Sequence, residues 1–354
     1  SNDFFEMGGN SLVAFQVILE VKKRLDKQLV LRDIFEHTTI RTLASILEDK
    51  SISKDNSFPK VAHKKYNLTS SAQERMFYQY LMNKQGLGYN ISGGIVIKGN
   101  FDQQALLDAL QVIVDRHPAL RTNFVHNEQG LYQYVNPKVT VSLEVFDQQI
   151  DDVNIAYHQF RRPHDLEKQN SLIRFGLFPI NDSKNILFLD MHHIICDGFS
   201  TRIILNEVKN ILMGEPLLPL THDYIDYSYW QRNENSWLQN QRNYWLEKLS
   251  GDLPVINLPM IEDREGIDMT NVGLLSSYIS EENYVNIKEM IREHEVTEFM
   301  FFISIYYLLL QKVIGKEDII IGTDVVGRTH TATKNIVGTF VNILPLRMDV
   351  AQEY

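Results

Sequence analysis

The chain has a single cysteine, Cys196, among its 354 residues, and this scarcity excludes an intramolecular disulfide. It also lacks any apolar run of the roughly 18 to 20 residues that a helix needs to cross a bilayer. The longest candidate, near Phe299–Leu310, is shorter and predicts a buried helix. We expect no signal peptide before Ser1. These absences favour a cytoplasmic protein without a membrane span.

Basic residues are fewer than acidic ones, with 35 Lys and Arg against 45 Asp and Glu, for a formal net charge of −10. A nucleic-acid-binding protein needs clustered positive charge, so we expect no nucleic-acid partner. The apolar fraction is 44%, which is enough for sizeable cores in more than one domain.

Two adjacent histidines, His192 and His193, follow the apolar run Asn185–Met191, which predicts a buried strand. An Asp-Gly turn and an amphipathic stretch, Phe199–Leu212, come next. A neutral imidazole at a strand end can act as a general base or position a substrate N–H. Because neighbouring side chains of a strand point to opposite faces, at most one of the two histidines should do chemistry.

Two other interpretations of this segment compete with a catalytic histidine. The histidines could be core or surface residues beside a turn, and a lone His-His pair favours that interpretation. Cys196 lies within the same segment and raises the idea of a thiol nucleophile, but a buried cysteine usually behaves as a small hydrophobic residue.

A second signal lies at the N-terminus, where residues 3–12 read DFFEMGGNSL. The two glycines permit a tight, close-approach loop, and Ser11 then opens an amphipathic helix. Ser11 could simply cap that helix. Alternatively, its hydroxyl could carry a phosphate-containing group, whose negative charge the helix N-terminus would tolerate. Spacing alone leaves both alternatives open.

Together these segments resemble the nonribosomal peptide synthetases. The pattern FFxxGGxSL at 4–12 is similar to the core motif of a peptidyl carrier protein, and HHxxxDG at 192–198 to the active-site motif of a condensation domain. Five further segments resemble condensation motifs in the family's order: SAQxRM at 71–76, RHxxLRTxF at 116–124, YxDYxxWQ at 224–231, IGTxxxGR at 321–328 and FVNxLPLR at 340–347.

The resemblance implies a multidomain chain. Residues 1–50 would be an all-α carrier helical bundle that lacks its N-terminal helix, and the polar, charged residues 51–66 would be a linker. A condensation domain would follow, built from two chloramphenicol-acetyltransferase-like α/β lobes with a tunnel between them. The N-lobe would cover 67–250 and a truncated C-lobe 251–354.

Hydrophobic periodicity predicts the individual elements. Helices are expected at 11–28, 31–37, 72–82, 102–116, 281–294 and 299–314, with another capped by Thr38 or Thr39. Strands are expected at 93–98, 131–135, 139–146, 186–191, 274–279 and 319–322. A break near 250–267 separates two α/β halves.

The resemblance also implies a reaction, which is formation of an amide by aminolysis of a thioester. Ser11 would carry covalent 4'-phosphopantetheine, and no metal ion is implied. His193 would face the tunnel and either take a proton from the amine or hold it in line. His192 would point away and help to pack the strand.

Other motif residues would support the site. Asp197 would order the turn through a salt bridge, with Arg328 favoured over Arg121 as its partner. Gly198 would let a substrate or its oxyanion approach the backbone at the helix start. Asn342 would either hydrogen-bond within the tunnel or serve in ordinary packing.

The implied partners are an upstream adenylation domain, downstream adenylation and carrier domains, a phosphopantetheinyl transferase and aminoacyl or peptidyl thioesters. The protein would be monomeric and bacterial. Carriers that feed an epimerisation domain tend to read GGDSI, whereas residues 8–12 read GGNSL, so the donor is expected to end in an L residue.

Three rival assignments remain within and beyond this family. An epimerisation domain shares HHxxxDG, although residues 199–202, FSTR, are nearer to the condensation pattern. A heterocyclisation domain is disfavoured because aspartates replace its histidines. A non-enzymatic recruitment module would usually have a degraded histidine motif, and this one is intact.

Overall fold

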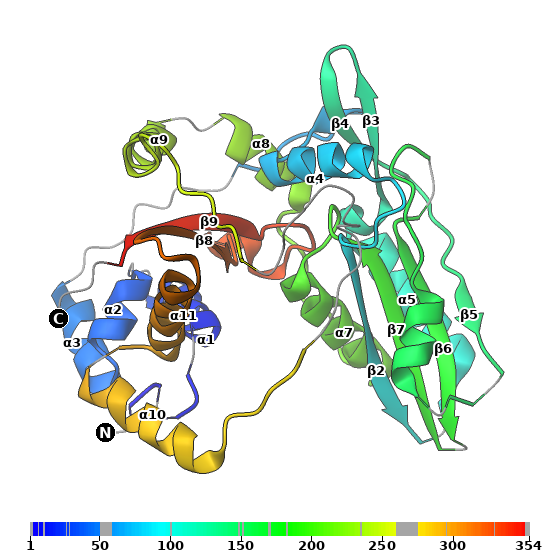
Figure 1. Cartoon of the computed structure of the whole chain (residues 1–354). Coiled ribbons are helices and arrows are strands. Elements are labelled where there is room, and N and C mark those ends of the chain that lie inside the picture. Colours follow the sequence, from blue (N-terminus) through cyan, green and yellow to red (C-terminus); the bar gives the residue numbers. More distant parts are fainter. Residues whose placement is uncertain are drawn as a thin grey trace. The chain divides into compact units, whose positions relative to one another are not determined.

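The computed structural model describes residues 3–49, 59–259 and 275–350, apart from positions 6, 10, 26, 28, 100, 148, 151, 169, 170, 182, 234, 235, 295 and 329. The chain forms two compact units (Figure 1). Unit 1 comprises Ser1–Glu234 and Val326–Asn342, and unit 2 comprises Asn235–Val325 and Ile343–Tyr354. The expected linker at 51–66 lies partly outside the described residues, because 51–58 are not among them.

The N-terminal region is helical, with α1 at Ser11–Leu25, α2 at Leu31–Glu36 and α3 at Ile40–Asp49. Its small core contains the buried side chains of Ala14 and Ile34. The first helix ends near Leu25, short of the predicted residue 28. The predicted cap of the last helix is present, since the Thr39 hydroxyl accepts a hydrogen bond from the Thr42 amide at 3.2 Å.

A four-stranded sheet forms the centre of unit 1. Its strand order is β2 (Asn90–Lys98), β7 (Lys184–His192), β6 (Ile173–Asn181) and β5 (Leu143–Val145). The pairs β2–β7 and β6–β7 are antiparallel, and β5–β6 is parallel. The strand predicted at 139–146 is therefore shorter than expected, because pairing with β6 covers Leu143–Val145 alone.

Both faces of this sheet are covered, which explains the consecutive apolar residues Ile186–Leu189 in β7. Leu187, Leu189 and Met191 face the cluster that includes α5 (Gln103–Arg116) and α7 (Gly198–Leu212). On the opposite face, Ile186 and Phe188 pack with α6 (Val153–Phe160). Side chains of β7 thus pack on both faces of the sheet, and the strand ends at His192.

A smaller sheet in unit 1 has the order β1 (Asn67–Leu68), β4 (Gly130–Val135) and β3 (Thr122–Asn127). Four further helical elements belong to the same unit: α4 at Ser71–Met82, η1 at Pro118–Arg121, α8 at Tyr224–Asn233 and η2 at Thr331–Asn335. The first turn of α4 carries a capping box, in which Ser70 and Gln73 bond each other's backbone amides at 3.2 and 3.0 Å.

Unit 2 contains the helices α9 (Ser236–Lys248), α10 (Glu281–Glu293) and α11 (Glu298–Ile314). The strands β8 (Asp318–Val325) and β9 (Asn342–Asp349) form a two-stranded sheet. Tyr307, Leu310 and Ile319 make its buried cluster.

One predicted strand of the second half is wrong. Residues 275–279 form no strand, and residue 274 lies outside the described residues. Leu275 and Tyr278 are almost fully exposed, so an apolar pattern here has no neighbouring strand to pair with among the described residues.

Within the described part of the chain, no single helix is long and apolar enough to cross a membrane. The pair α10 and α11 reaches the required length and composition together, but the two helices meet at 104°.

Candidate active site

The loop after β7 is held by the backbone on both sides. The His192 amide donates to the Leu172 carbonyl at 3.1 Å, and the His193 amide donates to the Tyr89 carbonyl at 2.7 Å. A tight turn follows, closed by the Ile195 amide on the His192 carbonyl at 3.1 Å. The two histidines are therefore fixed in their backbone before any side-chain contact is considered.

His192 is buried and neutral. Its Nδ1 accepts a hydrogen bond from the Ile194 amide at 3.1 Å, and its ring lies 6.2 Å from the rings of both Tyr89 and His164. Burial lowers the pKa of His192 to about 3, and the nearby His164 and His193 act in the same direction. This ring packs the end of the strand and is not placed to exchange protons near pH 7.

Beneath His192 lies a charged cluster that the sequence patterns did not reveal. Asp190 is fully buried in β7 and accepts from Arg174 Nη1 at 2.8 Å, Asn90 Nδ2 at 2.9 Å and Ser92 Oγ at 2.5 Å. Burial raises the pKa of Asp190, but the nearby His164 and Arg174 and the hydrogen bond from Ser92 outweigh it, so the net shift is downward. The sequence feature that could have indicated this cluster is Asp190 itself, a carboxylate within an otherwise apolar strand.

His164 is the fifth member of this cluster. Its Nε2 lies 3.3 Å from Asp190 Oδ2, although the angle falls outside hydrogen-bond geometry. Burial lowers its pKa despite the neighbouring carboxylate. The charged pair Asp190–Arg174 thus stabilises the strand end next to two neutral imidazoles.

His193 is half-buried, unlike its neighbour. Its Nδ1 lies 3.4 Å from the hydroxyl of Thr339, which belongs to the segment 326–342. Of the two predicted histidines, His193 is the one whose side chain has partial access to solvent.

Asp197 caps α7 and pairs with Arg328 across 131 positions of sequence. Arg328 Nη2 lies 2.9 Å from Asp197 Oδ1, and both side chains are almost completely buried. The same carboxylate accepts from the Ser200 amide at 2.7 Å and from the Phe340 amide at 3.1 Å. The pair therefore joins the start of α7 to the segment 326–342 within unit 1.

The guanidinium of Arg328 is further held by backbone and aromatic partners. Its Nη1 donates to the carbonyls of Thr333 and Ile336 at 2.5 and 2.8 Å, and its Cζ lies 4.1 Å from the Phe340 ring centroid. Burial lowers the pKa of Arg328, and the attraction of Asp197 opposes that shift. These contacts indicate an organising role for Asp197 and Arg328.

Gly198 is exposed at the first position of α7, and a Cβ added there would meet no atom within 4 Å. Open space next to helix N–H groups is what a developing negative charge would need. The approach of a substrate or its oxyanion at Gly198 stays a prediction.

Arg121 lies elsewhere and does not contact Asp197. Its Nε and Nη2 donate to the carbonyls of Val114 and Asp115 at 3.0 and 3.1 Å. These hydrogen bonds stabilise the C-terminal end of α5. Asn342 accepts from Arg75 Nη2 at 2.7 Å at the start of β9.

The remaining motif residues Tyr224 and Asp226 are buried in α8. The Tyr224 hydroxyl donates to the Thr339 carbonyl at 2.5 Å and lies 2.7 Å from Ser70 Oγ. Asp226 Oδ1 accepts from the Val61 amide at 2.8 Å, which fastens the chain just before β1. Both contacts are structural.

Cys196 is fully buried, and burial raises the pKa of its thiol well above the ordinary value. A nucleophilic cysteine needs an accessible thiolate. The geometry therefore offers no support for thiol chemistry at this position.

Ser11 is the first residue of α1. Gly8 has a φ of 88°, and a Cβ on Gly9 would lie 2.4 Å from the Phe4 carbonyl oxygen. Only glycines allow this loop to turn sharply into the helix. The N-terminus of a helix favours negative charge, so a serine at the first position of α1 fits an attached phosphopantetheine group.

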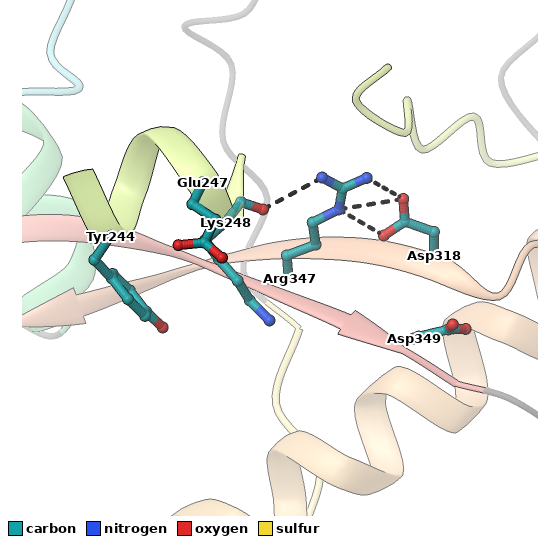
Figure 2. Close-up of a pocket in the computed structure, with 6 residues that line it drawn as sticks. All are labelled: Tyr244, Glu247, Lys248, Asp318, Arg347 and Asp349. Carbon is teal, nitrogen blue, oxygen red and sulfur yellow. Dashed lines mark hydrogen bonds and ion pairs between the residues drawn. The ribbon is translucent and has the colours of Figure 1, made fainter. Parts of the chain in front are cut away.

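Unit 2 holds an open hollow of about 610 Å³, lined by Tyr244, Glu247, Lys248, Asp318, Arg347 and Asp349. Figure 2 shows Arg347 of β9 facing Asp318 of β8, with Nη2 2.7 Å from Oδ2. Arg347 also donates to the Ser250 carbonyl at 2.9 Å. Because this motif arginine is engaged in holding the backbone, the hollow gives no sign of a second active site.

Comparisons with known proteins agree with the motifs. A family model described as "Condensation domain" matches residues 62–354, and one described as "Phosphopantetheine attachment site" matches residues 1–47. Tyrocidine synthase 3 of Brevibacillus parabrevis is 34% identical over 348 residues, which are 98% of this chain and 5% of the relative. Bacitracin synthase 3 of Bacillus licheniformis is also 34% identical, over 98% of this chain and 6% of its own length.

Solved structures show the same fold. The X-domain in its complex with OxyB from teicoplanin biosynthesis has a TM-score of 0.73 at 19% identity and covers 84% of this chain and 68% of its own. The four-domain nonribosomal peptide synthetase holo-AB3403, bound to AMP and glycine, has a TM-score of 0.71 at 19% identity, with 84% and 23% covered. The condensation domain of the Monacolin K polyketide synthase MokA has a TM-score of 0.68 at 22% identity, with 82% and 69% covered.

Proposed function

The chain belongs to the condensation-domain family of nonribosomal peptide synthetases and begins with a phosphopantetheine attachment domain, and from this premise we propose that it forms peptide bonds. The donor is an aminoacyl or peptidyl thioester, and the acceptor is the amine of an aminoacyl group on a downstream carrier. Since the chain spans 5% and 6% of the first two relatives, the neighbouring adenylation and carrier domains are part of the proposal.

Ser11 is the residue that would hold the phosphopantetheine group after modification by a phosphopantetheinyl transferase. When bound, this group supplies a thiol on which the donor acyl group is carried as a thioester. The helix N-terminus of α1 supports the assignment, because its amides favour the negative charge of the phosphodiester.

The bond change needs modest help from the protein. The amine nitrogen bonds to the thioester carbonyl carbon, the carbon–sulfur bond breaks, and the amine proton ends on the departing thiolate. An α-amine has a pKa of roughly 7.7 to 8.0, so a useful fraction is already neutral in the cytoplasm. His193 can therefore act by accepting a hydrogen bond from the amine, holding it in line and passing the proton onward.

Gly198 and the first turn of α7 would face the carbonyl oxygen as it becomes negative. Amides at a helix start are fixed donors, and such donors lower the barrier where charge develops. His192 would stay neutral and Asp197 would keep the turn in place.

The observation that carries this proposal is the asymmetry of the two histidines. His192 is buried with its pKa lowered to about 3, whereas His193 remains half-buried and open to a partner. One imidazole is thus left for chemistry at the end of the strand, where it could assist transfer of the acyl group to the amine.

A single-turnover assay with intact-protein mass spectrometry tests the proposal. Ser11 is loaded with an L-aminoacyl-phosphopantetheine, a soluble aminoacyl thioester is supplied as acceptor, and wild type is compared with His193→Ala. We expect loss of the donor mass and a dipeptidyl product in wild type, and a rate lower by about 10²–10⁴-fold in His193→Ala. Ser11→Ala should accept no loading.

The matched control is His158→Ala, which removes an exposed histidine on α6. It should turn over like wild type. Normal turnover by folded His193→Ala would refute the catalytic assignment. Loading without transfer in wild type as well as in the variant would favour a recruitment role, and scrambling of the donor Cα configuration without bond formation would favour epimerisation.

The donor configuration is the finer part of the proposal. Residues 8–12, GGNSL, support an L residue at the donor end. Comparing L- and D-loaded carriers in the same assay decides it, and a faster reaction of the D-loaded carrier would contradict it.

A further inference from the structure

Thr339 has an unusual position for a buried hydroxyl. It is fully buried, and its Oγ1 lies 3.4 Å from His193 Nδ1 and 3.9 Å from the sulfur of Met76. We propose that Thr339 is a positioning residue, which holds His193 in the tautomer with the proton on Nδ1 and the lone pair on Nε2. This proposal rests on the function proposed above, because it assigns the nitrogen that meets the amine.

The proton count of the hydroxyl leads to this tautomer. A threonine hydroxyl has one proton to donate, and a thioether sulfur can only accept. If Thr339 donates to Met76, its oxygen is left as an acceptor toward His193. Nδ1 must then carry the ring proton, and a neutral imidazole has its free lone pair on Nε2.

The backbone on both sides of Thr339 is firmly held, so the direction of the Cα–Cβ bond that carries the hydroxyl is fixed. The Gly338 amide and carbonyl lie 3.1 and 2.9 Å from Ser200 Oγ, and the Thr339 carbonyl accepts from the Tyr224 hydroxyl at 2.5 Å. The Phe340 amide donates to Asp197 at 3.1 Å. Three consecutive residues are thus anchored to unit 1.

Close packing removes the remaining freedom. A Cβ placed on Gly338 would lie 1.9 Å from the ring of Tyr224, so no other residue fits there without displacement. On the opposite side, the His193 amide is fixed to the Tyr89 carbonyl at 2.7 Å. Both partners of the Thr339–His193 contact are therefore positioned by their backbones.

The opposite tautomer has a different chemical meaning. If Thr339 donated to Nδ1, then Nε2 would carry the proton and could only donate, toward the thioester oxygen. Met76 would also lose its donor. The orientation of one hydroxyl consequently decides whether His193 receives the amine proton or stabilises the oxyanion.

Nuclear magnetic resonance of the ¹⁵N-histidine-labelled, full-length chain reads the tautomer without any substrate. Spectra are recorded at alkaline pH for wild type, Thr339→Val and Thr339→Ser, and the His193 ring signals are assigned by their absence in His193→Ala. We expect the Nδ1–H form in wild type, a mixture or the Nε2–H form in Thr339→Val, and restoration in Thr339→Ser. A wild-type His193 in the Nε2–H form would overturn the proposal.

The rate completes the test. We expect condensation to fall about ten-fold in Thr339→Val and to recover in Thr339→Ser, as loss of one hydrogen bond in the transition state implies. Thr333→Val is the matched control, since it removes another buried hydroxyl from the same segment, one that donates to the His330 carbonyl at 2.5 Å.

The outcomes separate this proposal from the function on which it rests. A Thr339→Val protein with an unchanged tautomer overturns the positioning role whatever its rate. If wild type forms no dipeptide but shows the Nδ1–H tautomer that Thr339→Val loses, the positioning role stands and the function proposed above fails.

Discussion

An Arg–Asp pair of unit 1, Arg328–Asp197, and an Arg–Asp pair of unit 2, Arg347–Asp318, differ in burial more than in geometry. In unit 1, Arg328 and Asp197 lie 2.9 Å apart with side chains 1% and 0% exposed. In unit 2, Arg347 and Asp318 lie 2.7 Å apart with side chains 20% and 40% exposed. Since solvent screens exposed pairs, a similar distance should carry very different energies.

The helices α7 of unit 1 and α11 of unit 2 also differ in burial. Ile204 of α7 is fully buried against the central sheet, whereas Ile305 of the more apolar α11 is 49% exposed. Apolar sequence makes a helix able to join a core, but burial depends on whether a facing element is present. Among the described residues, α7 has that element and much of α11 does not.

The largest expected effect comes from removing the charge of each pair without changing its shape. Asp197→Asn leaves the Arg328 guanidinium buried without its counter-charge and should lower the free energy of unfolding by about 3–5 kcal/mol. Asp318→Asn should change stability less, because the Arg347–Asp318 pair is partly exposed to water. Hydrogen exchange of peptides from β7 and β9 measures each unit separately.

Equal losses of unfolding free energy in Asp197→Asn and Asp318→Asn would contradict the expected dependence on burial. A stable but inactive Asp197→Asn protein would move Asp197 from an organising role to a catalytic one.

Next in size is the truncation of matched isoleucines. Ile204→Ala should cost about 3 kcal/mol, because it leaves a cavity between α7 and the sheet. Ile305→Ala should stay within about 0.5 kcal/mol of wild type. Urea unfolding measures both, and a large loss in Ile305→Ala would mean that α11 is covered in solution.

An effect that is absent near pH 7 and appears only as the pH falls is expected at His192. Its pKa is lowered to about 3 by burial, so the unfolded chain binds a proton below pH 6.5 that the folded chain does not. Stability contributed by this group is complete above pH 6.5 and falls by about 1.4 kcal/mol per pH unit as the pH drops from 6.5 toward 3.

The variant His192→Asn sharpens this point, because its amide oxygen can still accept from the Ile194 amide. Its unfolding free energy should depend less steeply on pH between 6.5 and 4 than that of wild type. His294→Asn, at an exposed helix end in unit 2, is the control and should keep the wild-type slope. An unchanged slope in His192→Asn would show that this histidine is not the group responsible.

Much of the fold could be predicted because strong periodicity marks its helices and its central strand. Helix α8 was missed because it has no clear apolar stripe, and its polar residues Asp226 and Ser228 are buried. Strand β6 contains Gly176 and Pro179, which obscure a strand pattern. The apolar residues near 275–279 predicted a strand that needs a partner elsewhere in space.

The candidate site likewise contains residues that the sequence identified and residues that it did not. His192, His193, Asp197 and Gly198 lie within seven residues and were visible as one motif. The hydroxyl of Thr339 and the Asp190 cluster were not visible, because their contacts join residues far apart in sequence and depend on which face of a strand each occupies.

The path of segment 326–342 has a consequence for how such chains can be recombined. Residues before and after it belong to unit 2, yet it carries Arg328 and Thr339 into unit 1. A crossover in the gene near residue 235 or 250 would pair Asp197 and His193 of one parent with the segment of another. Hybrid synthetases joined there should inherit a mismatched site, whereas exchanging residues 59–350 as one block keeps Asp197 with its own arginine.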